Sequence, residues 1–210
     1  MIEYVVPAEI EKKSFEIIEA ELKAKNIILP EDEKPVTMRV IHASADFDYA
    51  TAMRYSPDAV AIARKLLLEG ADIVTDTNMA KAGISKKTLE RFGGQVHCFM
   101  ADEDVAEEAK TRNITRAAVS MERAAKLGKP VIFAIGNAPT ALISLYEMME
   151  QGIFKPLFVI GVPVGFVNVE ASKELFLNSA EVPYIISRGR KGGSTIAAAI
   201  CNALLYGLKA

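Results

Sequence analysis

The run Val131-Ile132-Phe133-Ala134-Ile135 is followed at once by Gly136-Asn137-Ala138-Pro139, so five apolar residues lead directly into a turn and a proline. An apolar run of this length, bounded by turn residues, is typical of a strand buried on both faces of a parallel sheet. Comparable runs recur along the chain with helical stretches between them, which indicates a parallel sheet covered by helices. The sequence therefore predicts an α/β fold of three layers, in which helices flank a mostly parallel sheet.

The predicted strands are short apolar runs over residues 37–42, 71–75, 95–100, 131–135, 157–162 and 184–187. Helices are expected where apolar residues recur at helical spacing between these runs, over residues 8–25, 57–68, 114–127, 139–151, 172–178 and 193–208. The polar segment 25–34 is expected to be a surface loop before the first strand. Because no repeat, low-complexity tract or linker interrupts the pattern, a single domain over residues 1–210 is predicted.

The charge balance excludes some classes of partner. The chain carries 25 basic and 27 acidic residues, a net charge of −2, which gives no overall field for nucleic acid or for an anionic membrane. Residues 1–4 lack the basic and apolar pattern of a secretory leader, and no apolar run approaches the roughly 20 residues that span a bilayer. A cytoplasmic protein is predicted, in which local basic groups would bind any anionic ligand.

A protein-bound metal is not expected. Cys98 and Cys201 lack the CxxC spacing of a metal site and are interpreted as buried thiols. The two histidines, His42 and His97, lie far apart in the sequence.

Polar and small residues cluster after the predicted strands. In an open parallel sheet, ligands bind at the carboxyl ends of the strands. The segments found there are His42-Ala43-Ser44, Asp76-Thr77-Asn78-Met79, Gly136 to Thr140, Gly161 to Phe166 and Ser187 to Thr195. Turn formation alone would explain about half of these residues, so the rest indicate a binding edge.

His42 is a candidate general acid or base, because it is placed at a predicted strand end and an imidazole exchanges its proton near neutral pH. A core histidine bonded to backbone explains its position equally well. His97 lies among apolar neighbours in a predicted strand and is interpreted as structural.

The segment 188–195 is a candidate anion site. It carries Arg188, Arg190 and Lys191 beside Gly192 and Gly193, directly before a small-residue helix whose free N–H groups attract anions. It does not match the phosphate loop GxxxxGK[ST], and a solvated basic turn is the alternative.

Arg116 in the first turn of a predicted helix, and Ser14 on the first helix, are weaker candidates, for which ordinary surface positions are the alternative. No nucleophile elbow and no GxGxxG motif is present, which disfavours covalent hydrolysis and nicotinamide chemistry.

Taken together, these motifs resemble the precorrin-8X methylmutase family, including its cobalt-precorrin-8 members, along nearly the whole chain. The resemblance is carried by residues 14–18, 41–43, 76–83, 113–117, 135–142, 161–167, 170–173 and 188–194. The runs 135–142 (IGNAPTAL) and 163–167 (PVGFV) are long and specific.

The resemblance implies an isomerase of cobalamin biosynthesis that moves a methyl group from C-11 to C-12 of the corrin ring. This [1,5]-sigmatropic shift would yield hydrogenobyrinate, or cobyrinate when the substrate carries cobalt. It implies no added cofactor, a tetrapyrrole polycarboxylate substrate, and a homodimer with a shared active site. His42 matches the proton donor.

The carboxylate arms of such a substrate need scattered cationic contacts, for which Arg116, Arg188, Arg190, Lys191 and Gly192 are the candidates, while Ser14 and Asn137 match pocket positions. Asp46 and Asp48 follow His42, and either carboxylate near the ring would favour its charged form. The alternatives are a corrinoid carrier without catalysis and an unrelated α/β enzyme that binds a phosphorylated molecule through residues 188–195.

Overall fold

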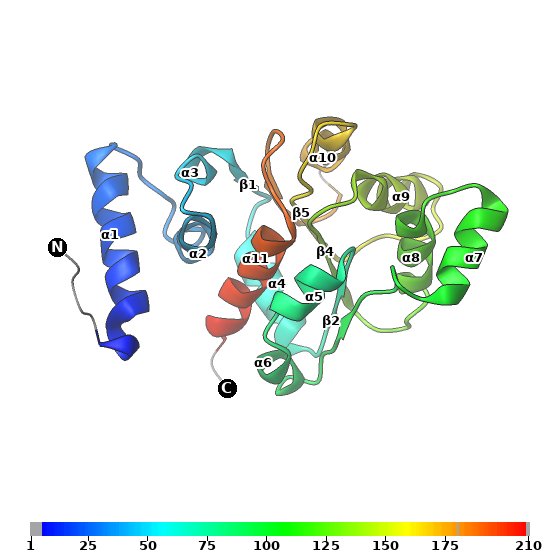
Figure 1. Ribbon diagram of the computed structural model, residues 1–210, viewed down its shortest axis with the longest axis horizontal. Helices are drawn as coiled ribbons and strands as arrows, with labels where there is room; N and C mark the ends of the chain where they lie inside the picture. The colour runs from blue at the N-terminus through cyan, green and yellow to red at the C-terminus, as the bar shows by residue number, and fades with distance from the viewer. Residues whose placement is uncertain (1–5, 180, 209–210) are drawn as a thin grey trace.

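The computed structural model describes residues 6–179 and 181–208, and within them a six-stranded sheet has the order β1-β6-β5-β4-β2-β3 (Figure 1). Neighbouring strands pair in parallel, except that β1 at one edge is antiparallel to β6. The mostly parallel sheet predicted from the sequence is confirmed. The strands are β1 Met53–Tyr55, β2 Asp72–Thr75, β3 Val96–His97, β4 Val131–Ile135, β5 Phe158–Gly161 and β6 Tyr184–Ser187.

The central strand β4 supplies side chains to both helical layers. Ile132 and Ala134 belong to one hydrophobic core, whereas Val131, Phe133 and Ile135 belong to the core on the opposite face. This division follows from the strand period of two. Each fully buried large side chain contributes about 1.5–3 kcal/mol relative to an exposed one, which is why a continuous apolar run is stable here.

Helices cover both faces of the sheet (Figure 1). The first face carries α2 Lys34–Ser44, α4 Ala59–Leu68, α5 Asn78–Gly83, α6 Lys86–Glu90 and α11 Ser194–Tyr206. The other face carries α8 Arg116–Ala124, α9 Pro139–Glu150 and α10 Val169–Leu177, with α7 Glu103–Arg112 against α8. The short elements η1 Pro7–Glu9 and α3 Tyr49–Ala52 precede α1 and β1, respectively.

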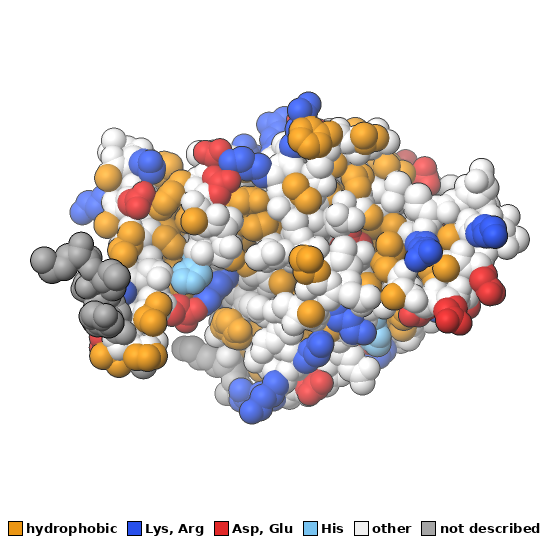
Figure 2. Space-filling model, in the orientation of Figure 1, with side chains coloured by type: hydrophobic (Ala, Val, Ile, Leu, Met, Phe, Trp, Pro, Cys, Tyr) orange, Lys and Arg blue, Asp and Glu red, His pale blue; other side chains and the backbone are white. Residues whose placement is uncertain are grey.

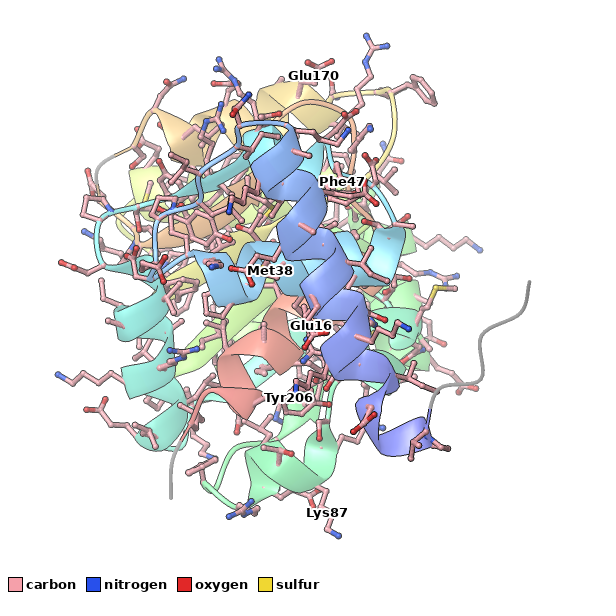
Figure 3. All side chains as sticks on the ribbon, turned by 90° about the vertical axis from the view of Figure 1, so that its left-hand side faces the viewer. Glu16, Met38, Phe47, Lys87, Glu170 and Tyr206 are labelled. Carbon is pink, nitrogen blue, oxygen red and sulfur yellow. The ribbon has the colours of Figure 1, made fainter. Side chains whose placement is uncertain are left out.

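Helix α1, Ile10–Ala24, packs against α2 on the side away from α11 (Figures 1 and 3). Figure 3 looks onto α1, with Met38 on α2 behind it and Tyr206 at the carboxyl end of α11. The segment between α1 and α2 is a loop, as predicted, but it joins two helices.

The predicted strand at residues 37–42 is wrong, because these residues lie within α2. Of the six positions from Val36 to Ile41, only Arg39 is not buried, since α2 is packed between α1 and α11. A short, densely apolar run does not distinguish a buried helix from a buried strand. The sequence signal for a helix was Pro35, which lies in the first turn of α2. Proline is favoured there because the N–H groups of the first turn have no acceptor within the helix.

Strand β1 was missed because it is three residues long and lies at the sheet edge. Helices α3, α5, α6 and α7 were also not predicted. They are short or, in α7, contain few apolar residues.

Cys98 and Cys201 are free and buried, as predicted. His97 bonds to Asp72 at 3.0 Å and stacks on Phe99, which agrees with its structural interpretation. Within the described ranges there is no cluster of three or more potential metal ligands. No helix there combines the length and apolar character needed to cross a membrane. Residues 1–4, on which the leader prediction rests, lie outside the described part.

Candidate active site

His42 lies in the last turn of α2, with a half-buried imidazole. The ring of Phe15 on α1 stacks on it, with 5.2 Å between the ring centroids and 30° between the planes. The predicted position at a strand end is therefore corrected. His42 reaches the site because α2 packs along α11, whose amino end continues from β6.

A surface hollow of about 390 Å³ lies in front of His42, between α2, α5 and α11. Its floor is the face of α11 that carries Ala198 and Ala199, whose small side chains leave the space above the helix open. Gly83 lets α5 approach this floor, because a Cβ there would lie 2.9 Å from the Cβ of Ala198. The hollow is lined by Arg39, His42, Ala43, Met79, Gly83, Thr195, Ala198, Ala199, Asn202 and Tyr206.

Arg39 is a cation in this hollow that the sequence reasoning missed. Its guanidinium lies 4.9 Å from the ring centroid of Phe15 and 5.3 Å from that of Tyr206, and it forms an ion pair with Glu11. Aromatic rings attract a guanidinium placed over their faces. Arg39 and His42 are three positions apart on one helix and therefore lie on the same face. In the predicted strand at residues 37–42 they would have pointed to opposite faces of the sheet.

Asp76 connects the carboxyl ends of β2 and β4. Its carboxylate accepts N–H bonds from Gly136 at 2.8 Å, Asn137 at 2.7 Å and Ala138 at 2.5 Å. Burial raises the pKa of Asp76, and these three donors oppose that rise. Asn137 is thus positioned through its backbone, and its exposed side chain is left available to a ligand.

Close backbone contacts join the ends of β4, β5 and β6. A Cβ on Gly136 would lie 2.8 Å from the Cα of Ser194, and one on Gly192 would lie 2.1 Å from the carbonyl oxygen of Val162. The hydroxyls of Thr77 and Ser194 are 2.7 Å apart, which adds the end of β2. The predicted convergence of polar segments at one edge of the sheet is confirmed for these four strands.

The cations of the segment 188–193, called the basic loop below, each pair with a carboxylate. Arg188 bonds to Glu174 at 3.0 Å, and Arg190 bonds to Glu170 at 2.8 Å. The guanidinium carbon of Arg190 lies 5.6 Å from the ring centroid of Phe166, a side chain that is 83% exposed. Figure 2 shows basic and apolar side chains side by side over α10, where these groups gather.

Lys191 forms ion pairs with both Asp46, at 2.7 Å, and Asp48. The bond to Lys191 holds the pKa of Asp46 below its ordinary value, and the two carboxylates raise the pKa of Lys191. The sequence hypothesis depended on one of these carboxylates approaching His42. The structure instead pairs both carboxylates with Lys191 of the basic loop.

None of the predicted binding residues lines the hollow of His42. Asn137 and the residues of the basic loop follow β4 and β6, whereas Ser14 and Arg116 lie on other helices. Ser14 precedes Phe15 on α1, and its hydroxyl donates to the carbonyl of Ile10 at 2.9 Å. Arg116 is the first residue of α8 and lines a separate hollow between α7 and α8 with Asn113 and Thr115. The structure does not bring Arg116 into the hollow of His42.

The site thus combines a histidine beside a shallow apolar floor with a basic loop at the carboxyl edge of an α/β sheet, an arrangement suited to an enzyme acting on a flat anionic molecule. Residues 9–207 match the family described as Precorrin-8X methylmutase. The chain belongs to this family, and it is an isomerase of cobalamin biosynthesis.

Two relatives and one solved structure illustrate the similarity. A Cobalt-precorrin-8 methylmutase of Priestia megaterium is 44% identical over 95% of this chain and 88% of its own length. A Precorrin-8X methylmutase of Pseudomonas aeruginosa is 40% identical over 97% of this chain and 98% of its own. The crystal structure of a precorrin-8x methyl mutase from Thermus thermophilus superposes with a TM-score of 0.84 at 37% identity, covering 94% of this chain and 96% of the other.

Proposed function

We propose that the protein moves a methyl group from C-11 to C-12 of precorrin-8 or its cobalt form, with His42 as the proton donor. The observation that supports this proposal is the position of His42. Its ring is half-buried against Phe15 and also lines a hollow whose floor consists of small side chains. A planar macrocycle on that floor would place one ring edge against the imidazole. Protonation of that region would ease migration, and a proton would return from the ring to the imidazole after the methyl group has moved, so that substrate and product remain isomers. A well-placed general acid contributes about 10²–10⁴-fold to rate.

The carboxylate arms of the substrate would spread from the hollow toward the basic loop. Arg39 supplies a cation inside the hollow, while Arg188, Arg190 and Lys191 are available at the carboxyl edge. Their ion pairs are largely exposed and contribute only about 0–1 kcal/mol each, so substrate carboxylates can replace Glu170, Glu174, Asp46 and Asp48. The N–H groups that follow Gly192 and Gly193 at the start of α11 add anion donors. Any cobalt arrives within the substrate.

A homodimer is part of the proposal. Two exposed apolar side chains, Met79 and Tyr206, line the hollow. Three more, Val164, Phe166 and Val167, belong to the segment after β5 that contacts the basic loop at Arg190. A second copy of the chain would cover these side chains and add walls to a hollow that is shallow for a macrocycle. Sedimentation velocity that gives a monomer at micromolar concentration would contradict this part.

The decisive experiment mixes the purified protein with precorrin-8, with and without cobalt, and follows the visible spectrum. His42→Ala is expected to lower kcat by about 10²–10⁴-fold while leaving binding nearly intact. His97→Gln is the matched control, since His97 lies in the separate Asp72 pair. Normal turnover by His42→Ala would exclude the assigned role, and binding without conversion by the unmutated protein would indicate a carrier.

A further inference from the structure

Lys173 on α10 is a fully buried lysine whose partners are all uncharged oxygens. Its side chain is 0% exposed, and its ammonium donates to the carbonyl of Gly189 at 2.6 Å, the carbonyl of Lys191 at 2.9 Å and the hydroxyl of Ser187 at 3.3 Å. The three donors of a lysine thus meet three acceptors in one segment. That segment runs from Ser187 at the end of β6 to Lys191 in the basic loop.

The charged neighbours of Lys173 are occupied elsewhere. Glu170, about one turn before Lys173, bonds to Arg190, and Glu174, the next residue after Lys173, bonds to Arg188. Helix α10 therefore holds the basic loop at three points, of which the outer two are exposed ion pairs and the middle one is the buried ammonium. Exposed pairs exchange readily with a competing anion, whereas the ammonium beneath the loop is inaccessible to it.

We infer that Lys173 is a positioning residue, which fixes the backbone of the basic loop so that its side chains and N–H groups can exchange their protein partners for the carboxylates of the substrate. The identity of that anion rests on the proposed function. The loop backbone stays in place during the exchange because Lys173 binds carbonyls and not the cations. Lys191 is included, since its carbonyl binds Lys173 while its ammonium binds Asp46 and Asp48.

The N–H donors of Lys173 are essential to this role, because the ammonium is the donor to the carbonyl of Gly189, whereas the carbonyl of Lys191 also accepts from the Ser187 hydroxyl at 2.8 Å. Lys173→Met keeps an unbranched chain but leaves the Gly189 carbonyl without its donor and removes one of the two donors to the Lys191 carbonyl. A buried acceptor that loses its partner favours opening by about 10- to 100-fold in the local equilibrium. Lys173→Arg keeps a cationic donor and should restore part of the order.

The first measurement needs no ligand. Hydrogen exchange of peptides covering residues 188–193 is compared among the unmutated protein, Lys173→Met, Lys173→Arg and the control Lys155→Met, which removes an exposed pair with Glu181. We expect exchange in the loop to rise at least about tenfold in Lys173→Met and to remain unchanged in Lys155→Met. Unchanged exchange in Lys173→Met would overturn the inference.

A variant with an intact core covers the case in which Lys173→Met fails to fold. The double variant Glu170→Gln, Glu174→Gln removes both outer ion pairs and leaves the ammonium in place. Its loop should exchange within about twofold of the unmutated rate, because exposed pairs contribute little. If this variant loosens the loop tenfold, the ion pairs hold it and Lys173 does not.

The second measurement uses precorrin-8 and hydrogenobyrinate as probes. Lys173→Met should raise KM and the Kd of hydrogenobyrinate about tenfold while kcat changes less than about threefold, since His42 lies on α2. A loosened loop with unchanged KM and Kd would overturn the positioning role. Failure of the unmutated protein to bind either probe would instead refute the proposed function, and the exchange data alone would then decide whether Lys173 orders the loop.

Discussion

The ring of Phe15 on α1 stacks on the imidazole of His42 on α2 at 5.2 Å, so a helix at the periphery of the molecule fixes the proposed acid. Removal of that ring would free the imidazole to rotate. Phe15→Ala is therefore expected to lower kcat by about tenfold and to destabilise the fold by about 1–3 kcal/mol through lost packing. Steady-state kinetics and urea unfolding measure the two effects.

Ile17→Ala is the matched control for Phe15, because Ile17 is an exposed residue of the same helix. It should leave kcat unchanged. A Phe15→Ala enzyme with normal kcat would show that the stacking does not orient His42.

Arg39 is expected to bind a carboxylate arm beside His42. Arg39→Met would remove the cation while keeping much of the packing between Phe15 and Tyr206. We expect KM to rise about tenfold, the effect of losing one charge-assisted hydrogen bond. Glu11→Gln, which removes only the ion-pair partner, should leave KM equal or lower, and an equal rise in both variants would contradict direct binding by Arg39.

Asp76 is predicted to be required for stability more than for chemistry. Asp76→Asn would set an amide N–H₂ against at least one of the three backbone donors now bound by the carboxylate. We expect a loss of about 2–4 kcal/mol in the free energy of unfolding, measured by urea denaturation. Asp102→Asn, at a largely exposed pair with Arg123, is the control and should cost less than about 1 kcal/mol.

Two glycines of the basic loop should respond differently to alanine. In Gly192→Ala the new Cβ would lie 2.1 Å from the backbone oxygen of Val162, so the loop must move, and KM should rise more than about tenfold. In Gly189→Ala nothing lies within 4 Å of the new Cβ, and the positive φ of 78° costs about 1–2 kcal/mol. Equal KM values would show that the approach of Gly192 to β5 is not needed for binding.

Lys173 should give the unfolding free energy a characteristic pH dependence. Burial lowers its pKa to about 8, while nearby Glu170 opposes the shift, and in the unfolded chain the pKa returns to about 10.4. Between these values the unfolded state binds more protons, so the contribution of Lys173 rises with pH. Urea unfolding at pH 7.5 and 9.5 should therefore show a larger gain for the unmutated protein than for Lys173→Arg, and an equal gain would contradict the shift.

Much of the carboxyl edge could be predicted from the sequence, because it depends on local order along the chain. The run from Val131 to Pro139 specifies a strand, a turn and a helix by itself, and parallel pairing then places its end beside those of β2, β5 and β6. The site around His42 could not be predicted in the same way. The packing of α1 and α11 on α2 decides which side chains face His42, and the apolar density of residues 37–42 fits a strand equally well.

Arg39 and Lys173 illustrate the same limit. Arg39 becomes a neighbour of His42 only when the segment is helical, and Lys173 in the sequence resembles any lysine between two glutamates. Its burial results from the return of the chain, from β6 onward, over α10.

The strand order β1-β6-β5 also affects how the chain folds during synthesis. Strand β1 pairs with β6, and the bond from Tyr184 N–H to Ser56 Oγ joins residues 128 positions apart. At about 5–20 residues per second, β1 would wait about 6 to 25 s for its partner. During that interval β1 has no partner strand, and α11, which forms the floor of the hollow beside His42, has not yet been synthesised. Catalytic competence would thus be gained only after α11 has been synthesised, and a chain interrupted before α11 would lack the floor of the hollow.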